Sequence, residues 1–134
     1  MDIKKIDHVG IVVWDIDASI PKYEKLLGLK FRNKEYNEDF NCFIAFFECA
    51  DVLVELVQPL GPSKALTWLE TRGEGINHIC YEVDDINAAF KEAKEKDMTD
   101  YEKPLTGAGE SKVFFLREER LCSVQTELVE LKKQ

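Results

Sequence analysis

Long apolar segments, an excess of basic residues and closely spaced cysteine pairs are all missing from this sequence. Its longest apolar runs, such as residues 42–47, are far too short to cross a bilayer. No basic segment followed by an apolar one opens the chain, so we expect no signal peptide, no membrane partner and a cytoplasmic location. The 18 lysines and arginines are scattered and outnumbered by 26 acidic residues, giving a net charge of −8. This balance argues against a nucleic-acid partner, which needs a basic surface.

Cysteine and histidine are also too few, or too far apart, for the common small metal motifs. The four cysteines include no C-x-x-C pair, which makes a zinc knuckle an unsuitable interpretation. We expect them to be reduced thiols with structural or incidental roles. The chain has only two histidines in 134 residues, a length that suits a single domain over 1–134.

The chain repeats itself. Residues 6–27 align over residues 76–97 without a gap, at an offset of 70. Unrelated segments of this length share about one identical residue, given average residue frequencies. These segments share six, namely Ile6/Ile76, His8/His78, Val13/Val83, Asp15/Asp85, Ile16/Ile86 and Ala18/Ala88. Both histidines of the chain therefore lie at equivalent places of the repeat.

A second match follows at nearly the same offset. Residues 51–58 lie over residues 123–130, with Glu55/Glu127 among the four identities. The offset is 72 here, so one loop of the second copy is two residues longer. The sequence predicts two modules, about residues 1–60 and 75–134, and a connector over 61–74 with helical spacing at 65–71.

Each module has the pattern β-α-β-β-β. In the first, a strand over 6–13 precedes a helix that Asp15 or Asp17 caps and Gly28 ends. Within this helix, Ile16, Ile20, Tyr23 and Leu27 lie at helical spacing. Strands are expected near 31–36, 41–48 and 52–57, and, in the second module, a strand at 76–83, a helix at 86–96 and strands near 99–102, 112–117 and 123–131. Neither module buries its sheet alone, so we predict an α+β fold in which two βαβββ modules pair into a curved, cup-like mixed sheet.

The repeat also selects four residues with metal-binding chemistry. His8 and His78 face away from the β-branched or aromatic stripe of their strands, and Glu55 and Glu127 stand in the apolar contexts VELV and TELV. A carboxylate there is costly to bury unless it is paired, protonated or metal-bound. Any one of these residues alone would fit a structural role. Their recurrence as equivalents favours a site for one divalent ion, such as cobalt, nickel, zinc, manganese or iron.

Glu48, Glu130, Asp15 and Asp85 are weaker candidates for ligands. Glu130 has the opposite strand parity from Glu127, and Glu48 has no equivalent in the second module. The two aspartates recur at helix starts, where capping explains them.

The sequence resembles the vicinal oxygen chelate superfamily, which includes glyoxalases, bleomycin resistance proteins and dioxygenases. Within it the likeness is greatest to the methylmalonyl-CoA epimerases. It is carried by residues 6–31, by VELVQPLG with the following GEGINHICYEVDDI, and by the terminal TELVE. The resemblance implies the metal ligands His8, Glu55, His78 and Glu127, the same four residues that the repeat selects, and a homodimer.

Residues 106–130 depart from the epimerase pattern. A loop histidine is absent, Arg117-Glu118 replaces a proline region, and Cys122 stands where a glycine is expected. The resemblance therefore leaves the exact substrate open, while the fold and the metal site are unaffected.

The implied activity is inversion of the α-carbon of a malonyl-CoA-type thioester through an enolate that a metal ion stabilises. We expect Glu127 to be a ligand and also a base, with Glu55 the second acid/base group. A glyoxalase I-like lyase acting on a thiol hemithioacetal fits the same four residues. A ring-cleaving dioxygenase needs only one carboxylate, so Glu55 argues against it. A non-catalytic drug-binding protein is the alternative outside enzymes.

Overall fold

The computed structural model describes residues 1–133. The chain divides into two compact units. We call them the His8 unit, residues 8–77, and the His78 unit, residues 1–7 together with those from His78 onward. None of the helices in the described residues is long and apolar enough to cross a membrane. The predicted division of a single domain into modules over about residues 1–60 and 75–134, with a connector at 61–74, stays a prediction.

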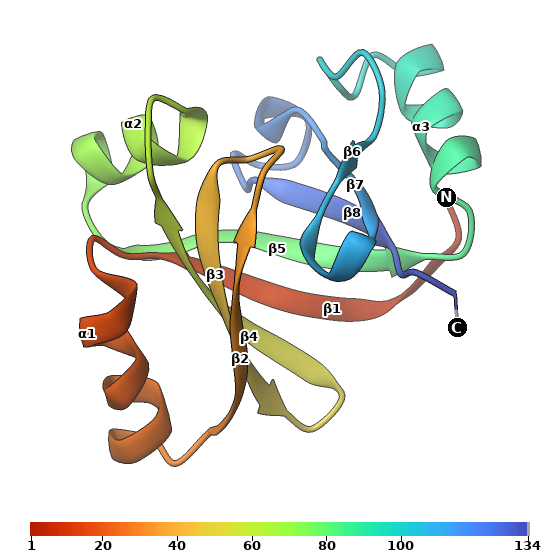
Figure 1. The fold of residues 1–134 in the computed structure, drawn as a ribbon. Helices are drawn as coiled ribbons and strands as arrows, with labels where there is room; N and C mark the ends of the chain where they lie inside the picture. Colours follow the sequence, from red (N-terminus) through yellow and green to blue (C-terminus); the bar gives the residue numbers. More distant parts are fainter. Residues whose placement is uncertain (134) are drawn as a thin grey trace. The chain divides into compact units, whose positions relative to one another are not determined.

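The His8 unit contains the first copy of the repeat (Figure 1). Its elements are β1 (Ile3–Val12, from His8 onward), α1 (Ile16–Pro21), a π-helical turn (Lys22–Leu26), β2 (Lys30–Asn37), β3 (Cys42–Cys49), β4 (Val52–Pro59) and α2 (Lys64–Arg72). The strand order is β2-β3-β4-β1. Strands β2, β3 and β4 are antiparallel neighbours, whereas β1 runs parallel to β4. Helix α2 contains the predicted helical spacing at 65–71 and extends one residue beyond it at each end.

The core of this unit lies between α1 and the sheet. Alternation in the strands and helical spacing in α1 bring together the buried side chains of Val13, Ile16, Ala45, Phe47 and Leu56. Ile20 and Tyr23 pack against them, in line with their helical spacing. Burial of these apolar groups is the main source of stability for the unit.

Leu27 is the exception: although its spacing fits the helix, it is 66% exposed. The helix changes to π geometry after Pro21, with Leu27 N–H donating to the Lys22 carbonyl at 3.3 Å. The wider turn takes Leu27 out of register with the apolar face of α1. Leu29 packs against the core instead, after the predicted stop at Gly28, whose φ is +77°.

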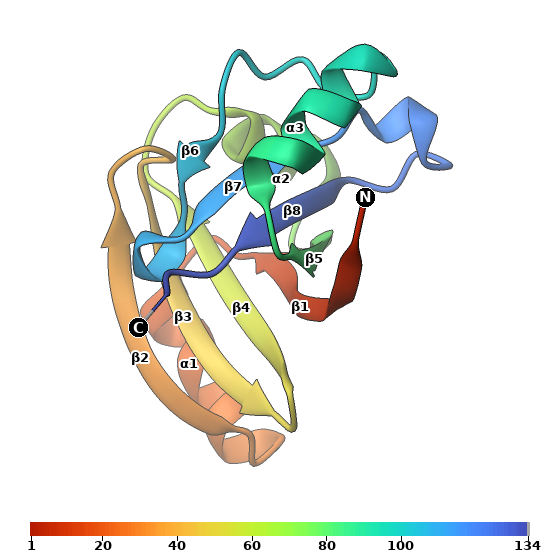
Figure 2. The same ribbon diagram turned by 90° about the vertical axis from the view of Figure 1, so that its right-hand side faces the viewer.

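The His78 unit repeats the same plan (Figure 2). Its elements are β5 (Gly75–Val83, from His78 onward), α3 (Ile86–Glu95), β6 (Leu105–Thr106), β7 (Lys112–Phe115) and β8 (Thr126–Glu130), with short 3₁₀ turns at Ala108–Glu110 and Glu118–Arg120. The strand order is β5-β8-β7-β6, with β5 parallel to β8 and the other pairs antiparallel. The core packs α3 against β7 and β8 through Ile86, Ala89, Ala93, Phe114 and Leu128. The predicted α+β class with two βαβββ modules is confirmed.

Two strand predictions in this unit are wrong. Residues 99–102 form no strand, because Thr99 Oγ1 donates to the Phe115 carbonyl at 2.7 Å and accepts from Tyr101 N–H at 3.2 Å. These side-chain bonds occupy groups that a strand ladder would use, and the strand forms later, at β6. The last strand begins only at Thr126, because Cys122 and Ser123 have left-handed backbone, with φ of +58° and +65°.

Equivalent groups cap the two main helices. The Asp15 carboxylate accepts from Ala18 N–H at 3.1 Å, and that of Asp85 accepts from Ala88 N–H at 3.1 Å. Capping by both aspartates is thereby confirmed. The first N–H group of each helix donates to a side chain of the sheet. Ile16 N–H donates to Gln58 Oε1 and Ile86 N–H donates to Glu130 Oε1, both at 2.9 Å. The repeat thus includes the attachment of each helix to its sheet.

Candidate metal centre

The first histidine–glutamate pair lies on β1 and β4 of the His8 unit. These parallel strands place Gly10 opposite Glu55, and His8 lies two residues before Gly10, on the same face of β1. His8 Nδ1 is 3.0 Å from Glu55 Oε2. The side chains are only 8% and 6% exposed, so the imidazole and the carboxylate contact each other away from bulk water.

The second pair lies on β5 and β8 of the His78 unit, in the same register. Cys80 stands opposite Glu127, and His78 lies two residues before Cys80. His78 Nε2 is 3.3 Å from Glu127 Oε1, and both residues are buried. The sequence equivalence of the two pairs is therefore also an equivalence of strand pairing and of side-chain contact.

Small residues opposite the glutamates make room for these contacts. Gly10 has no side chain and Cys80 a short one, so each glutamate side chain can lean along the strand toward the histidine two residues away. A large side chain at either place would occupy that space. The sequence alone does not reveal this role, because it does not show that Gly10 and Cys80 are paired with the two glutamates across neighbouring strands.

Each pair provides one imidazole and one carboxylate in a buried setting. A buried carboxylate is expensive unless a cation or hydrogen-bond donors compensate it. A protonated histidine supplies part of that compensation, and a divalent cation supplies it fully, since imidazole and carboxylate are both good ligands for such ions. The residues present therefore fit a metal ion. Joint binding of one ion by all four residues, as the sequence predicts, stays a prediction.

Two aromatic residues of the His78 unit complete the surroundings of its pair. The ring of Phe115 meets that of His78 edge-on at 5.3 Å between centroids, and Tyr101 lies 6.3 Å from Phe115. Burial, and then the negative charge of Glu127, raise the pKa of Tyr101 to about 12. The Tyr101 hydroxyl therefore stays protonated well above neutral pH, within range of the charge of Glu127. The sequence does not indicate a role for Tyr101, because this residue lies in the segment wrongly predicted as a strand.

The weaker acidic candidates have structural roles. Glu130 bonds the first turn of α3 rather than facing the histidines. Glu48 pairs with Lys30 at 3.1 Å and Arg32 at 3.2 Å, and these cations lower the pKa of its carboxyl group. Their lower ranking in the sequence analysis agrees with these contacts.

The sequence is similar to a known protein family and to individual members of it. A family model described as the Glyoxalase/Bleomycin resistance protein/Dioxygenase superfamily matches residues 7–115. Among curated proteins, the chain is 30% identical to an uncharacterised protein of Bacillus subtilis, YqjC, over 97% of this chain and 94% of that protein. It is 34% identical to an ethylmalonyl-CoA/methylmalonyl-CoA epimerase of Cereibacter sphaeroides, over 83% of this chain and 81% of the epimerase.

Solved structures include a similar epimerase with a bound ligand. The chain matches a variant of Streptomyces coelicolor methylmalonyl-CoA epimerase in complex with 2-nitronate-propionyl-CoA, with a TM-score of 0.91 and 28% identity. The match covers 98% of this chain and 100% of that structure. The predicted vicinal oxygen chelate fold is confirmed by this likeness.

Proposed function

This chain belongs to the glyoxalase/bleomycin resistance/dioxygenase superfamily, and we propose that it is a metal-dependent epimerase of a malonyl-CoA-type thioester. The observation that carries the proposal is the pair of buried histidine–glutamate contacts at equivalent registers of the two units. The epimerase relatives, one of them in complex with a CoA thioester analogue, support the same reaction class.

The residues that would hold the ion are His8, Glu55, His78 and Glu127. Two imidazoles and two carboxylates suit cobalt, nickel, zinc or manganese. When bound, the ion supplies a Lewis acid that draws electron density from the thioester carbonyl. The Gly10 and Cys80 positions keep both carboxylates beside their histidines. Four ligands from two copies of one module explain why the repeat keeps both residues of each pair.

The reaction removes the α-proton from one face of the α-carbon and returns a proton to the other face. We assign Glu127 the role of base: its carboxylate takes the α-proton, and the electrons of the C–H bond move toward the thioester carbonyl oxygen. Glu55, in its protonated form, delivers a proton to the opposite face of the α-carbon, which inverts the centre. A carboxylate bound to a cation is a weak base, so a glutamate that held the ion would have to be free of it to act as base or acid.

Tyr101 is near enough to Glu127 for the charge of that carboxylate to act on its hydroxyl. A tyrosine hydroxyl is neutral at physiological pH, and the raised pKa of Tyr101 extends this range to about pH 12, so it can offer a hydrogen-bond donor without adding a second negative charge. Such a donor would hold the Glu127 side chain in one orientation. We assign Tyr101 as a positioning residue.

The test is exchange of the α-proton in deuterated water. Protein from which metal has been removed is reloaded with each ion in turn and incubated with methylmalonyl-CoA of one configuration. We expect one solvent deuteron at the α-carbon and loss of optical purity, both abolished by chelation. Absence of exchange with every ion contradicts the proposal. Turnover of a thiol hemithioacetal in place of the thioester would assign the lyase reaction, and binding without turnover would assign a binding protein.

A further inference from the structure

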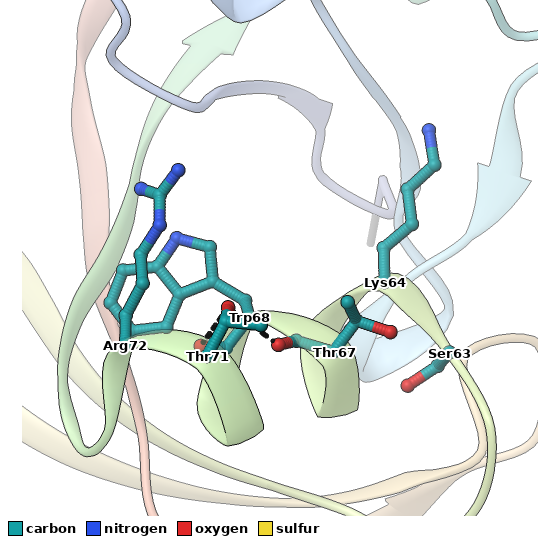
Figure 3. A pocket seen from close by; sticks show the side chains of 6 residues that line it. All are labelled: Ser63, Lys64, Thr67, Trp68, Thr71 and Arg72. Atoms are coloured by element: carbon teal, nitrogen blue, oxygen red, sulfur yellow. Dashed lines mark hydrogen bonds between the residues drawn. The ribbon is translucent and has the colours of Figure 1, made fainter.

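One face of α2 carries a pocket that the chemistry above does not use (Figure 3). The pocket has a volume of about 430 Å³, within the range of small-molecule sites. Every lining residue comes from one short segment: Ser63, Lys64, Thr67, Trp68, Thr71 and Arg72. Lys64, Trp68 and Arg72 are four residues apart, so they form one stripe on the helix. We call this pocket the α2 groove.

The α2 groove is positively charged within an acidic chain. Lys64 and Arg72 line it and no acidic residue does. Neither cation has an ion pair with any of the residues 1–133 that the structure describes. The chain as a whole carries a net charge of −8. Two unpaired cations on one helix face therefore select an anion against a repulsive background.

The groove also has an aromatic surface with an unused donor. The Trp68 indole N–H is buried and has no acceptor among the described residues. The Arg72 guanidinium lies 5.3 Å from the centroid of the Trp68 ring, and in Figure 3 both side chains rise from the same side of the helix as Lys64. A buried donor without a partner is rare in proteins and calls for an explanation. A ligand acceptor that draws the Arg72 side chain aside would satisfy this one.

The hydroxyl groups of the groove are partly committed. Ser63 Oγ accepts from Leu66 N–H at 3.1 Å, and Thr71 Oγ1 donates to the Thr67 carbonyl at 2.8 Å. The strongest donors for a ligand are the Lys64 ammonium, the Arg72 guanidinium and the Trp68 indole, and the hydroxyl groups of Ser63 and Thr67 can donate as well. This set suits phosphate oxygens beside a flat heteroaromatic ring.

We propose that the α2 groove binds the phosphorylated adenine nucleotide at the end of the CoA moiety of the substrate. The proposal rests on the proposed function, because that function supplies a substrate that carries phosphates and a purine. Lys64 and Arg72 bind phosphate oxygens, and Trp68 packs against the base. Recognition of the nucleotide and chemistry at the acyl group are then separate tasks of different residues.

Substrates with and without the nucleotide test the groove. With methylmalonyl-CoA, Lys64→Ala and Arg72→Ala should each raise KM about tenfold, the loss expected for one charge-assisted contact. With the methylmalonyl thioester of pantetheine, which lacks the nucleotide, the same changes should have little effect. Lys25→Ala, which removes an exposed lysine of the His8 unit, is the matched control. Unchanged KM for the CoA substrate, or equal changes with both substrates, would overturn the proposal.

Direct binding separates this proposal from the proposed function. Adenosine 3′,5′-bisphosphate is titrated while Trp68 fluorescence is recorded in a Trp14→Phe background, since the chain has two tryptophans. We expect a saturable change that weakens with salt and is lost in the Lys64→Ala/Arg72→Ala variant. Binding without epimerisation would refute the epimerase and retain the groove. Epimerisation without nucleotide binding, or equally tight binding of inorganic phosphate, would refute the groove.

Discussion

At the scale of single residues, position determines the chemistry of each glutamate. Glu127 and Glu130 lie three residues apart on β8, yet Glu127 contacts His78 and Glu130 bonds the backbone of α3. The sequence separates them by strand parity, because residues an odd number apart point to opposite faces. It also pairs each glutamate with a histidine, through the repeat. It does not reveal the contact distances, which depend on the small residues Gly10 and Cys80 opposite.

Replacement of Glu127 tests its assigned role as base. Glu127→Gln keeps the size of the side chain and an oxygen ligand but removes its basicity. We expect a folded protein that retains measurable metal and loses deuterium exchange by on the order of a hundredfold or more. Glu130→Gln, on the same strand, is the matched control and should keep its activity, because the amide oxygen still caps α3. Full exchange in Glu127→Gln would refute this role.

Glu55 provides an internal comparison. Glu55→Gln should reduce exchange less than Glu127→Gln, because the resemblance to the epimerases implies that glutamine is accepted at this position. Deuterium exchange of the two variants, measured side by side with the same metal ion, checks the order. Equal losses would favour a symmetric scheme with two equivalent bases, or a glyoxalase-like reaction.

Tyr101 makes stability depend on pH in the alkaline range. Its pKa is raised from the ordinary 10.0 to about 12 in the folded protein. Below pH 10 the hydroxyl is protonated in both states; between these values the unfolded chain releases its proton first. The free energy of unfolding should therefore fall as pH rises through this window, by about 2 kcal/mol once solvent screening of the partly exposed ring is allowed for. Denaturant unfolding of the metal-free protein measures the fall.

Two tyrosine variants provide the controls for this pH dependence. Tyr101→Phe should remove most of the fall in the free energy of unfolding above pH 10. In an alkaline titration it should also remove the tyrosinate absorbance that develops last. Tyr36→Phe, which replaces an exposed tyrosine, should leave the fall in place. The prediction fails if the stability of wild type and Tyr101→Phe changes in parallel above pH 10.

At the scale of elements, the sequence predicts those whose pattern is local. Alternation over residues 6–13 and the spacing of Ile86, Ala89 and Ala93 give β1 and the buried face of α3. The errors occur where contacts distant in sequence decide the conformation. Thr99 bonds to the Phe115 carbonyl, sixteen residues away, and no strand forms at 99–102. Likewise, the π-helical turn at Lys22–Leu26 moves Leu27 into solvent, although its spacing fits the helix.

The connector shows a different limit. Its helix is predictable from spacing, whereas the stripe of Lys64, Trp68 and Arg72 has no equivalent in the repeat that would single it out. A spacing of four residues in cationic and aromatic side chains was the available signal. The lack of ion-pair partners for the two cations could not be known from the sequence.

The helix caps give a matched pair of predictions for the two units. Asp15→Ala and Asp85→Ala each remove a carboxylate that accepts from the first turn of a helix. Each should lower the free energy of unfolding by about 1 kcal/mol. Asn87→Ala, at an exposed position of α3, is the control and should cost nothing. Denaturant unfolding checks all three, and a cost confined to one aspartate would contradict the equivalence of the two units.

At the scale of the whole molecule, the repeat links fold and function. A single module would provide one histidine and one glutamate, too few ligands to hold a transition metal firmly. Two copies double this set without any new motif, and both copies retain the pair in the same strand register. The predicted homodimer follows only from the resemblance to the family, and sedimentation of the purified protein is the measurement for it.

The number of metal ions bound per chain tests the central claim most directly. If both histidine–glutamate pairs serve one site, titration of the metal-free protein should end at one divalent ion per chain. His8→Ala and His78→Ala, one in each unit, should each lower the affinity for that same ion by roughly tenfold or more. Even residues that only hydrogen-bond to metal ligands have effects of this size. Two ions per chain, each lost with only one of the histidines, or no uptake at all, would contradict the account.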